Sequence, residues 1–132
     1  MIKDGERVEG NTARTSTLIT LAAAGAATFN SADQNNENGR GVHVIVDITV
    51  ATTTSVTFKI QGKDPVSAAY YDLLTSAALT GTGTTLLTVY PGLTAATNTV
   101  VSQVLPKTWR VNAVVTGASS ALTATVGANV IV

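Results

Sequence analysis

His43 and Asp47 lie four positions apart, in an alternating run of residues that continues to Thr49. Side chains separated by an even number of positions project from the same face of an extended strand, so these two could form a histidine–carboxylate pair. Acid–base catalysis by such a pair also needs a third partner and a cleft. The neighbouring residues indicate neither. We therefore interpret the pair as part of the solvent-facing side of a strand, and a hydrolase is the least favoured function.

Two aspartates, Asp64 and Asp72, flank a turn that begins in the segment GKDP at residues 62–65. Calcium-binding loops need oxygen ligands at fixed intervals, and no such spacing surrounds these residues. Aspartate side chains at turns commonly accept hydrogen bonds from nearby backbone amides. We therefore predict that Asp64 caps the turn.

Aromatic side chains could form a platform that binds a sugar or a nucleic-acid base. The candidates are Trp109, which is followed by Arg110, and the tyrosines Tyr70, Tyr71 and Tyr90. Only 5% of the residues are aromatic, however, and basic residues are not interleaved with them. Large aromatic rings contribute most when they are buried in a core. We therefore expect Trp109 to pack in the interior.

Other chemistry has little support in the residue inventory. The chain has no cysteine, which excludes a thiol nucleophile, a disulfide and a cysteine-ligated metal, and its single histidine excludes a paired-histidine metal site. The glycine-rich segment GTGTT at residues 81–85 lacks the lysine of a phosphate-binding loop, and no GxSxG motif is present. The sequence therefore predicts a protein that is not an enzyme and has no catalytic residues, cofactor or metal.

The 132 residues carry no net charge, and only 12% of them are charged. This balance argues against binding to nucleic acid or to anionic lipid by bulk electrostatics. No window offers the roughly 20 mainly apolar residues of a membrane-spanning helix. Residues 17–27 have the length of a signal-peptide core, but mixed acidic and basic residues precede them, which disfavours that reading. We expect no membrane and no nucleic-acid partner.

Charge divides the chain into an arm and a body. Nine of the sixteen charged residues lie in the first 40 positions. Residues 1–15 are polar and contain glycine, which predicts an extended N-terminal arm, and residues 16–132 form the body. The charged residues of the arm are of both signs, interspersed, and are Lys3, Asp4, Glu6, Arg7, Glu9 and Arg14.

The body consists of short segments with a two-residue hydrophobic period, separated by turn residues. The expected strands cover residues 16–24, 42–50, 56–61, 70–79, 84–90, 97–104, 108–116 and 121–132, the last with a possible bulge at Gly127. Segments 42–50 and 56–61 are close enough to predict a hairpin. About eight strands at regular spacing indicate an all-β fold, an antiparallel sandwich of the jelly-roll or immunoglobulin-like kind.

The final strand is unusual because it carries no charge and ends in Val130, Ile131 and Val132. Exposed edge strands are normally protected by charged residues or proline. We therefore expect the strand to be covered, either by the core of the domain or by another subunit. The second alternative predicts self-association into a homo-oligomer through these three residues.

Four motifs in the body, GKDP (62–65), YYDLL (70–74), VYPG (89–92) and LPKTWRV (105–111), together resemble a family of small β-sandwich virion proteins of tailed bacteriophages. The resemblance covers residues 41–132 and is to capsid decoration, or cement, proteins. It implies a structural protein, made in the host cytoplasm, that binds the phage major capsid protein on the outer capsid surface and stabilises contacts between capsomers. It also favours a trimer, because decoration sites often lie on threefold axes.

The N-terminal arm has an expected role, and two alternative functions stay open. An arm with interspersed acidic and basic residues suits an attachment segment that orders on the capsid or adds a strand to a neighbour. Two other functions share the predicted fold. One is a tail or head–tail connector protein, and the other is a carbohydrate-binding or adhesin module that uses Trp109 and the tyrosines.

Overall fold

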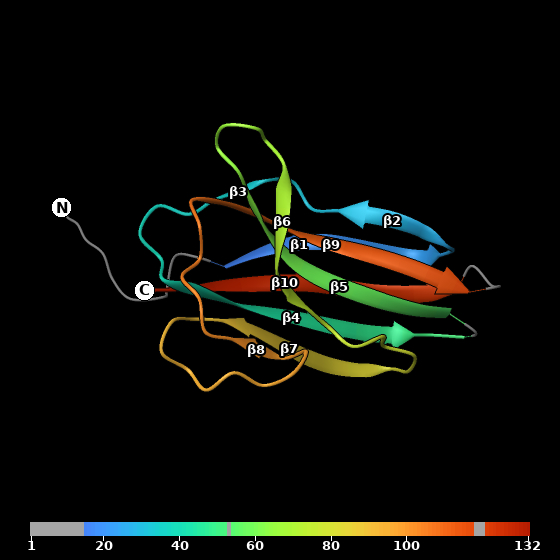
Figure 1. Cartoon of the computed structure of the whole chain (residues 1–132). Coiled ribbons are helices and arrows are strands. Elements are labelled where there is room, and N and C mark those ends of the chain that lie inside the picture. Colours follow the sequence, from blue (N-terminus) through green and yellow to red (C-terminus); the bar gives the residue numbers. More distant parts are fainter. Residues whose placement is uncertain (1–14, 53, 118–120) are drawn as a thin grey trace, which may run out of the picture.

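The computed structural model describes residues 15–52, 54–117 and 121–132, and in these residues the chain forms strands and no helix (Figure 1). Accordingly, this part of the chain has no helix with the length and apolarity to cross a bilayer. The strands are β1 (Thr15–Ala24), β2 (Ala27–Asn30), β3 (Gln34–Asn35), β4 (Gly41–Val50), β5 (Thr54–Lys63), β6 (Tyr70–Thr75), β7 (Gly83–Val89), β8 (Val100–Val101), β9 (Thr108–Gly117) and β10 (Leu122–Ile131).

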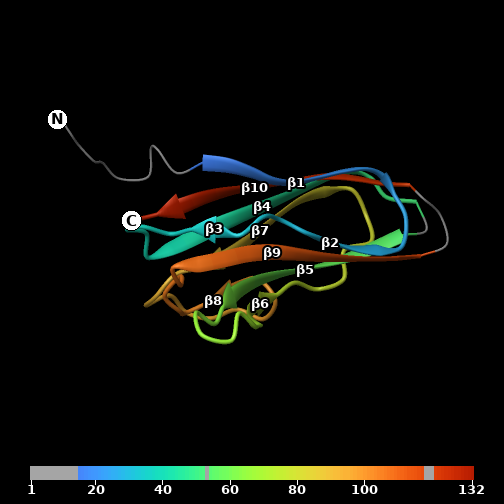
Figure 2. The same cartoon turned by 90° about the horizontal axis from the view of Figure 1, so that it is seen from above.

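The strands form two sheets that pack face to face (Figure 2). The first sheet has the order β1-β10-β4-β7-β8, and the second has the order β2-β9-β5-β6, with β3 also pairing with β9. Every pairing between named strands is antiparallel except that of β7 with β8. The predicted all-β sandwich is therefore confirmed.

Alternation along the strands produces the core. In β4 and β5, every second side chain faces the opposite sheet and is buried, and the intervening residues face outward. Each fully buried valine, leucine, isoleucine or phenylalanine contributes roughly 1.5–3 kcal/mol. The largest of the fully buried side chains are Trp109, Phe58, Ile60, Leu87 and Leu122.

The predicted hairpin between residues 42–50 and 56–61 is wrong. β4 pairs with β10 and β7, whereas β5 pairs with β9 and β6, so the chain crosses from one sheet to the other between Val50 and Thr54. Tight hairpins depend on glycine or asparagine at the positions of positive φ, and residues 51–55 contain neither. Proximity in sequence therefore did not make these strands neighbours.

Three other elements differ from expectation. The strand expected at 97–104 is reduced to Val100–Val101, and the one expected at 70–79 ends at Thr75. No register shift occurs at Gly127 between β10 and β4. The irregularity lies instead on the facing strand, between Thr17 and Ile19 of β1, which pair with Gly127 and Val126. The extra residue in β1 is a bulge, a feature that hinders strand addition at an edge.

Both edge strands of the second sheet end at a buried serine whose hydroxyl replaces a backbone carbonyl. Ser31 follows β2; its N–H donates to the Val111 carbonyl (2.9 Å), and its Oγ accepts from the Val111 N–H (2.9 Å). Ser76 follows β6 and bonds to Phe58 in the same way, at 2.8 and 2.9 Å. Each hydroxyl also donates to the carbonyl of the next residue. The serines thus complete the pairing of β9 and β5 where the edge strands turn away.

Candidate functional site

The two groups of residues predicted to bind partners lie at opposite ends of the sequence. The charged arm residues Lys3, Asp4, Glu6, Arg7, Glu9 and Arg14 lie outside the described residues. The C-terminal group lies in β10 and just beyond it.

β10 is an interior strand of the first sheet. It pairs with β4 through Val130 and Ile131, and with β1 as far as Asn129. The Arg40 N–H donates to the Ile131 carbonyl (2.7 Å), so the loop before β4 covers the end of the strand. Val130 and Ile131 are half-buried, and Val132 is exposed. The cover for β10 therefore comes from this same chain. Self-association through Val130, Ile131 and Val132 stays a prediction, and it would have to use their side chains because the strand has no open edge along most of its length.

His43 and Asp47 lie on the outer face of the first sheet, as the alternation predicted. His43 is half-buried and Asp47 is exposed, and Ile45 lies between them on the same face. The Thr84 hydroxyl donates to Asp47 Oδ1 at 3.5 Å, the outer limit of a hydrogen bond. The pair therefore faces solvent, as expected, and forms part of an open surface.

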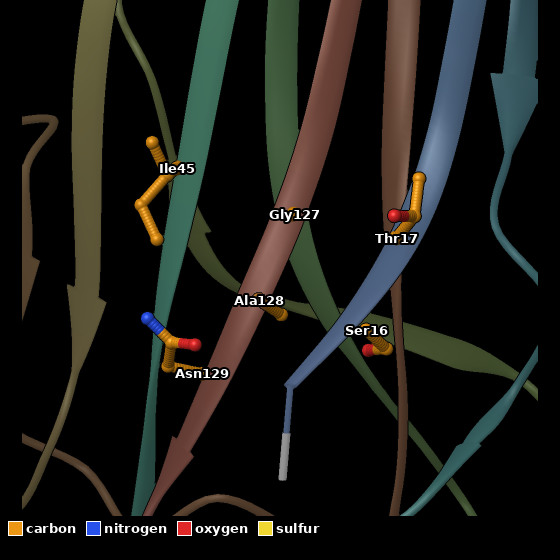
Figure 3. A pocket seen from close by; sticks show the side chains of 6 residues that line it. All are labelled: Ser16, Thr17, Ile45, Gly127, Ala128 and Asn129. Atoms are coloured by element: carbon orange, nitrogen blue, oxygen red, sulfur yellow. The ribbon is translucent and has the colours of Figure 1, made fainter.

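This outer face of the first sheet is almost free of charge. In its five strands, all of which the structure describes, Asp47 is the only charged residue. A shallow hollow lies over Gly127, between Thr17 on β1 and Ile45 on β4 (Figure 3). Gly127 leaves this space open because a Cβ atom there would meet only the Ser16 carbonyl oxygen, at 3.6 Å.

The outer face of the second sheet has the opposite character. The Lys63 Nζ atom lies 2.9 Å from Asp33 Oδ2, and the Tyr70 hydroxyl donates to Asp33 Oδ1 at 2.7 Å. The hydrogen bonds from Tyr70 and then Lys63 hold the pKa of Asp33 below its usual value, and the bond to Asp33 raises the pKa of Lys63. Asp33 thus links the loop after β2 to β5 and β6.

The same network continues across the sheet through Arg110. Its guanidinium carbon lies 3.4 Å from the centroid of the Tyr70 ring, and its Nε donates to Gln61 Oε1 at 2.9 Å. Gln61 Nε2 donates to Asp72 Oδ1 at 2.9 Å, and Lys59 lies 3.2 Å from the other carboxylate oxygen of Asp72. The hydrogen bond from Gln61 is the largest cause that lowers the pKa of Asp72.

We call these seven residues the Arg110 network: Asp33, Lys59, Gln61, Lys63, Tyr70, Asp72 and Arg110. Sequence reasoning did not find it, because its members come from four segments that only the sheet pairing brings together. The available signal was the alternation of Lys59, Gln61 and Lys63, which places them on the outer side of one strand.

The aromatic residues do not form the platform considered from the sequence. Trp109 is 1% exposed and packs in the core, as expected, so its ring cannot stack on a sugar. Its Nε1 is buried with no hydrogen-bond partner in the part of the chain that the structure describes. Tyr70 lies beneath Arg110, and Tyr71, at 45% exposure, is the one exposed tyrosine among Tyr70, Tyr71 and Tyr90.

Asp64 caps the turn between β5 and β6, as predicted. Its Oδ1 accepts hydrogen bonds from the backbone amides of Val66 (2.8 Å) and Ser67 (3.4 Å). These bonds lower the pKa of Asp64. Across residues 15–52, 54–117 and 121–132, no three histidine, aspartate or glutamate side chains lie together where they could hold a metal ion.

No protein-family model, no curated protein and no solved structure matches the chain.

Proposed function

We propose that this chain is a structural virion protein that binds the outer surface of a phage capsid and stabilises contacts between capsomers. The observation that carries the proposal is the contrast between the two outer faces of the sandwich, one nearly uncharged and the other bearing the Arg110 network. Small-molecule sites are usually concave and mostly enclosed. Wide, open faces of this kind suit contact with another protein surface.

The sequence motifs that resemble decoration proteins support the same proposal, because three of them supply residues of the Arg110 network. GKDP contains Lys63, YYDLL contains Tyr70 and Asp72, and LPKTWRV contains Arg110. Residues from three of the four motifs therefore meet on one face of the second sheet, whereas VYPG begins at the end of β7 of the first sheet.

The proposal is tested by the copy number of this chain in density-purified virions, measured against the major capsid protein by quantitative mass spectrometry. Abundance comparable to that of the capsid protein is expected. A number of copies that fits a single ring would replace the proposal with a tail or head–tail connector role. Absence from the particles would overturn any virion role and favour a carbohydrate-binding module, which a glycan array would then test.

The arm has a separate role in this proposal, as the segment that attaches the body to the capsid. Deleting residues 2–14 is expected to abolish capsid binding and to leave the circular dichroism spectrum of the body unchanged. A truncated protein that still saturates capsids would show that the arm is not the anchor.

Self-association into a trimer is the remaining part of the proposal. Both edges of β10 are paired along most of its length, so the contacts between copies would come from exposed side chains such as Val132. Analytical ultracentrifugation at micromolar concentration is expected to detect the trimer. A monomer under these conditions would contradict association in solution.

A further inference from the structure

Arg110 is the one cation of its network without a carboxylate partner in the described residues. Lys63 pairs with Asp33, and Lys59 pairs with Asp72, whereas Arg110 contacts the Tyr70 ring and the Gln61 amide oxygen. The three cations and two carboxylates give the network one net positive charge; Arg110 lies near enough to Asp33 to lower the pKa of that carboxyl but forms no ion pair with it. The charge belongs to the residue nearest the middle of the network.

The contacts of Arg110 hold its guanidinium group in place but leave most of its donors unused. A guanidinium group has five N–H donors, and only Nε–H is engaged, by Gln61. The four N–H donors of the two Nη atoms have no hydrogen-bond acceptor in residues 15–52, 54–117 and 121–132. Stacking on Tyr70 and the bond to Gln61 restrict the side chain before any partner arrives, so little rotamer entropy remains to be lost on binding.

We infer that the outer face of the second sheet is the docking surface and that Arg110 anchors it by a bidentate interaction with a carboxylate of the capsid protein. The inference rests on the proposed function and names the partner group at that surface. Arginine and tyrosine are enriched among the residues that dominate protein interfaces. The fixed fork of a guanidinium group matches a carboxylate, which forms two parallel hydrogen bonds with it.

A carboxylate on a protein fits this face better than the phosphates of a nucleic acid. Nucleic-acid binding depends on several cations that each neutralise a phosphate. Here two of the three cations are already paired, and the whole chain has no net charge. A single oriented cation suits one acidic side chain on a protein surface.

The test measures binding of the full chain to capsids assembled without it, for the wild-type protein and for Arg110→Gln, Arg110→Lys and Lys107→Gln. We expect Arg110→Gln to bind about thirtyfold more weakly or worse, as for an interface hot spot. Arg110→Lys is also expected to lose about tenfold or more in affinity, because lysine cannot form the paired hydrogen bonds. Lys107→Gln removes the same charge from an exposed residue outside the network, and we expect a change of less than about twofold.

Circular dichroism and thermal unfolding first establish that each variant folds. If Arg110→Gln does not fold, Tyr70→Leu serves as the second variant, because it removes the ring that orients Arg110 and is also expected to weaken binding by about tenfold.

Two outcomes separate this inference from the proposed function. Wild-type affinity in both Arg110 variants would show that Arg110 does not bind the capsid carboxylate and would leave the decoration role intact. Failure of the wild-type chain to bind capsids would overturn both.

A third outcome concerns the chemical class of the partner. Binding to double-stranded DNA that Arg110→Gln abolishes would overturn the choice of a protein carboxylate.

Discussion

Replacing Ser31 or Ser76 with alanine removes a hydroxyl that serves as a hydrogen-bond acceptor for an interior strand. Both serines are buried, at 7% and 3% exposure, and each Oγ accepts a backbone N–H at 2.9 Å, from Val111 or Phe58. Alanine would leave that buried N–H without a partner, which costs about 1–3 kcal/mol. We therefore expect Ser31→Ala and Ser76→Ala each to lower the free energy of unfolding by that amount. The two sites lie on opposite edges of the sheet, so the double variant should show the sum, about 2–6 kcal/mol.

The assay is urea unfolding, followed by circular dichroism and analysed by linear extrapolation. Ser67→Ala is the matched control, because Ser67 is exposed and its hydroxyl bonds only within a surface turn, to the Ala69 amide at 3.3 Å and to Asp64. We expect this control to change stability by less than about 0.5 kcal/mol. The reasoning is refuted if both buried serines can be replaced with no more effect than the control. A large loss of stability in only one of the two variants would mean that a serine hydroxyl replaces a backbone carbonyl at that edge alone.

Three further measurements test the packing and electrostatics. Thermal unfolding of Gly41→Ala should show a free energy of unfolding lower by about 2 kcal/mol or more, because the new Cβ atom would collide with the Val89 carbonyl oxygen. Gly127→Ala is the control and should change the free energy of unfolding by less than about 0.5 kcal/mol. Native fluorescence of Trp109, the only tryptophan, should be blue-shifted and resist acrylamide quenching, and an exposed-type spectrum would contradict its burial. The carboxyl of Asp72 has a lowered pKa in the fold, so its stabilising effect is present above its unfolded pKa of about 3.9 and is lost as pH falls through the lower folded value. The melting temperature should therefore decrease as the pH is lowered below about 4. The decrease should be less steep in Asp72→Asn.

The alternation of residues was sufficient to predict the long strands and their buried faces. Val42, Val44 and Val46 are fully buried and alternate with the half-buried His43 and Ile45, and burial of one side of β4 follows directly from that period. The expectation that the large ring of Trp109 packs in the interior is confirmed as well. These features depend only on local geometry and on the exclusion of apolar side chains from water.

Strand pairing could not be predicted in the same way. The lack of glycine and asparagine in residues 51–55 disfavours a tight hairpin but does not specify which strands β4 and β5 join, and the crossing between the sheets decides that. The Arg110 network depends on that outcome, because Tyr70 reaches Arg110 only when β6 and β9 lie on either side of β5. A site assembled from separate segments has no local sequence signal.

The position of β10 between β1 and β4 has a consequence for the order of biosynthesis. On the ribosome, β1 and β4 emerge long before the strand that joins them, so the first sheet cannot close until residues 122–131 have been translated. Pairing between the first and last strands has the largest loop-closure cost in the chain, which favours slow folding. During that interval the uncharged β1 is exposed to other nascent chains, a condition that favours aggregation. A product released at residue 120 should therefore be a substrate for chaperones and proteases rather than a smaller folded domain.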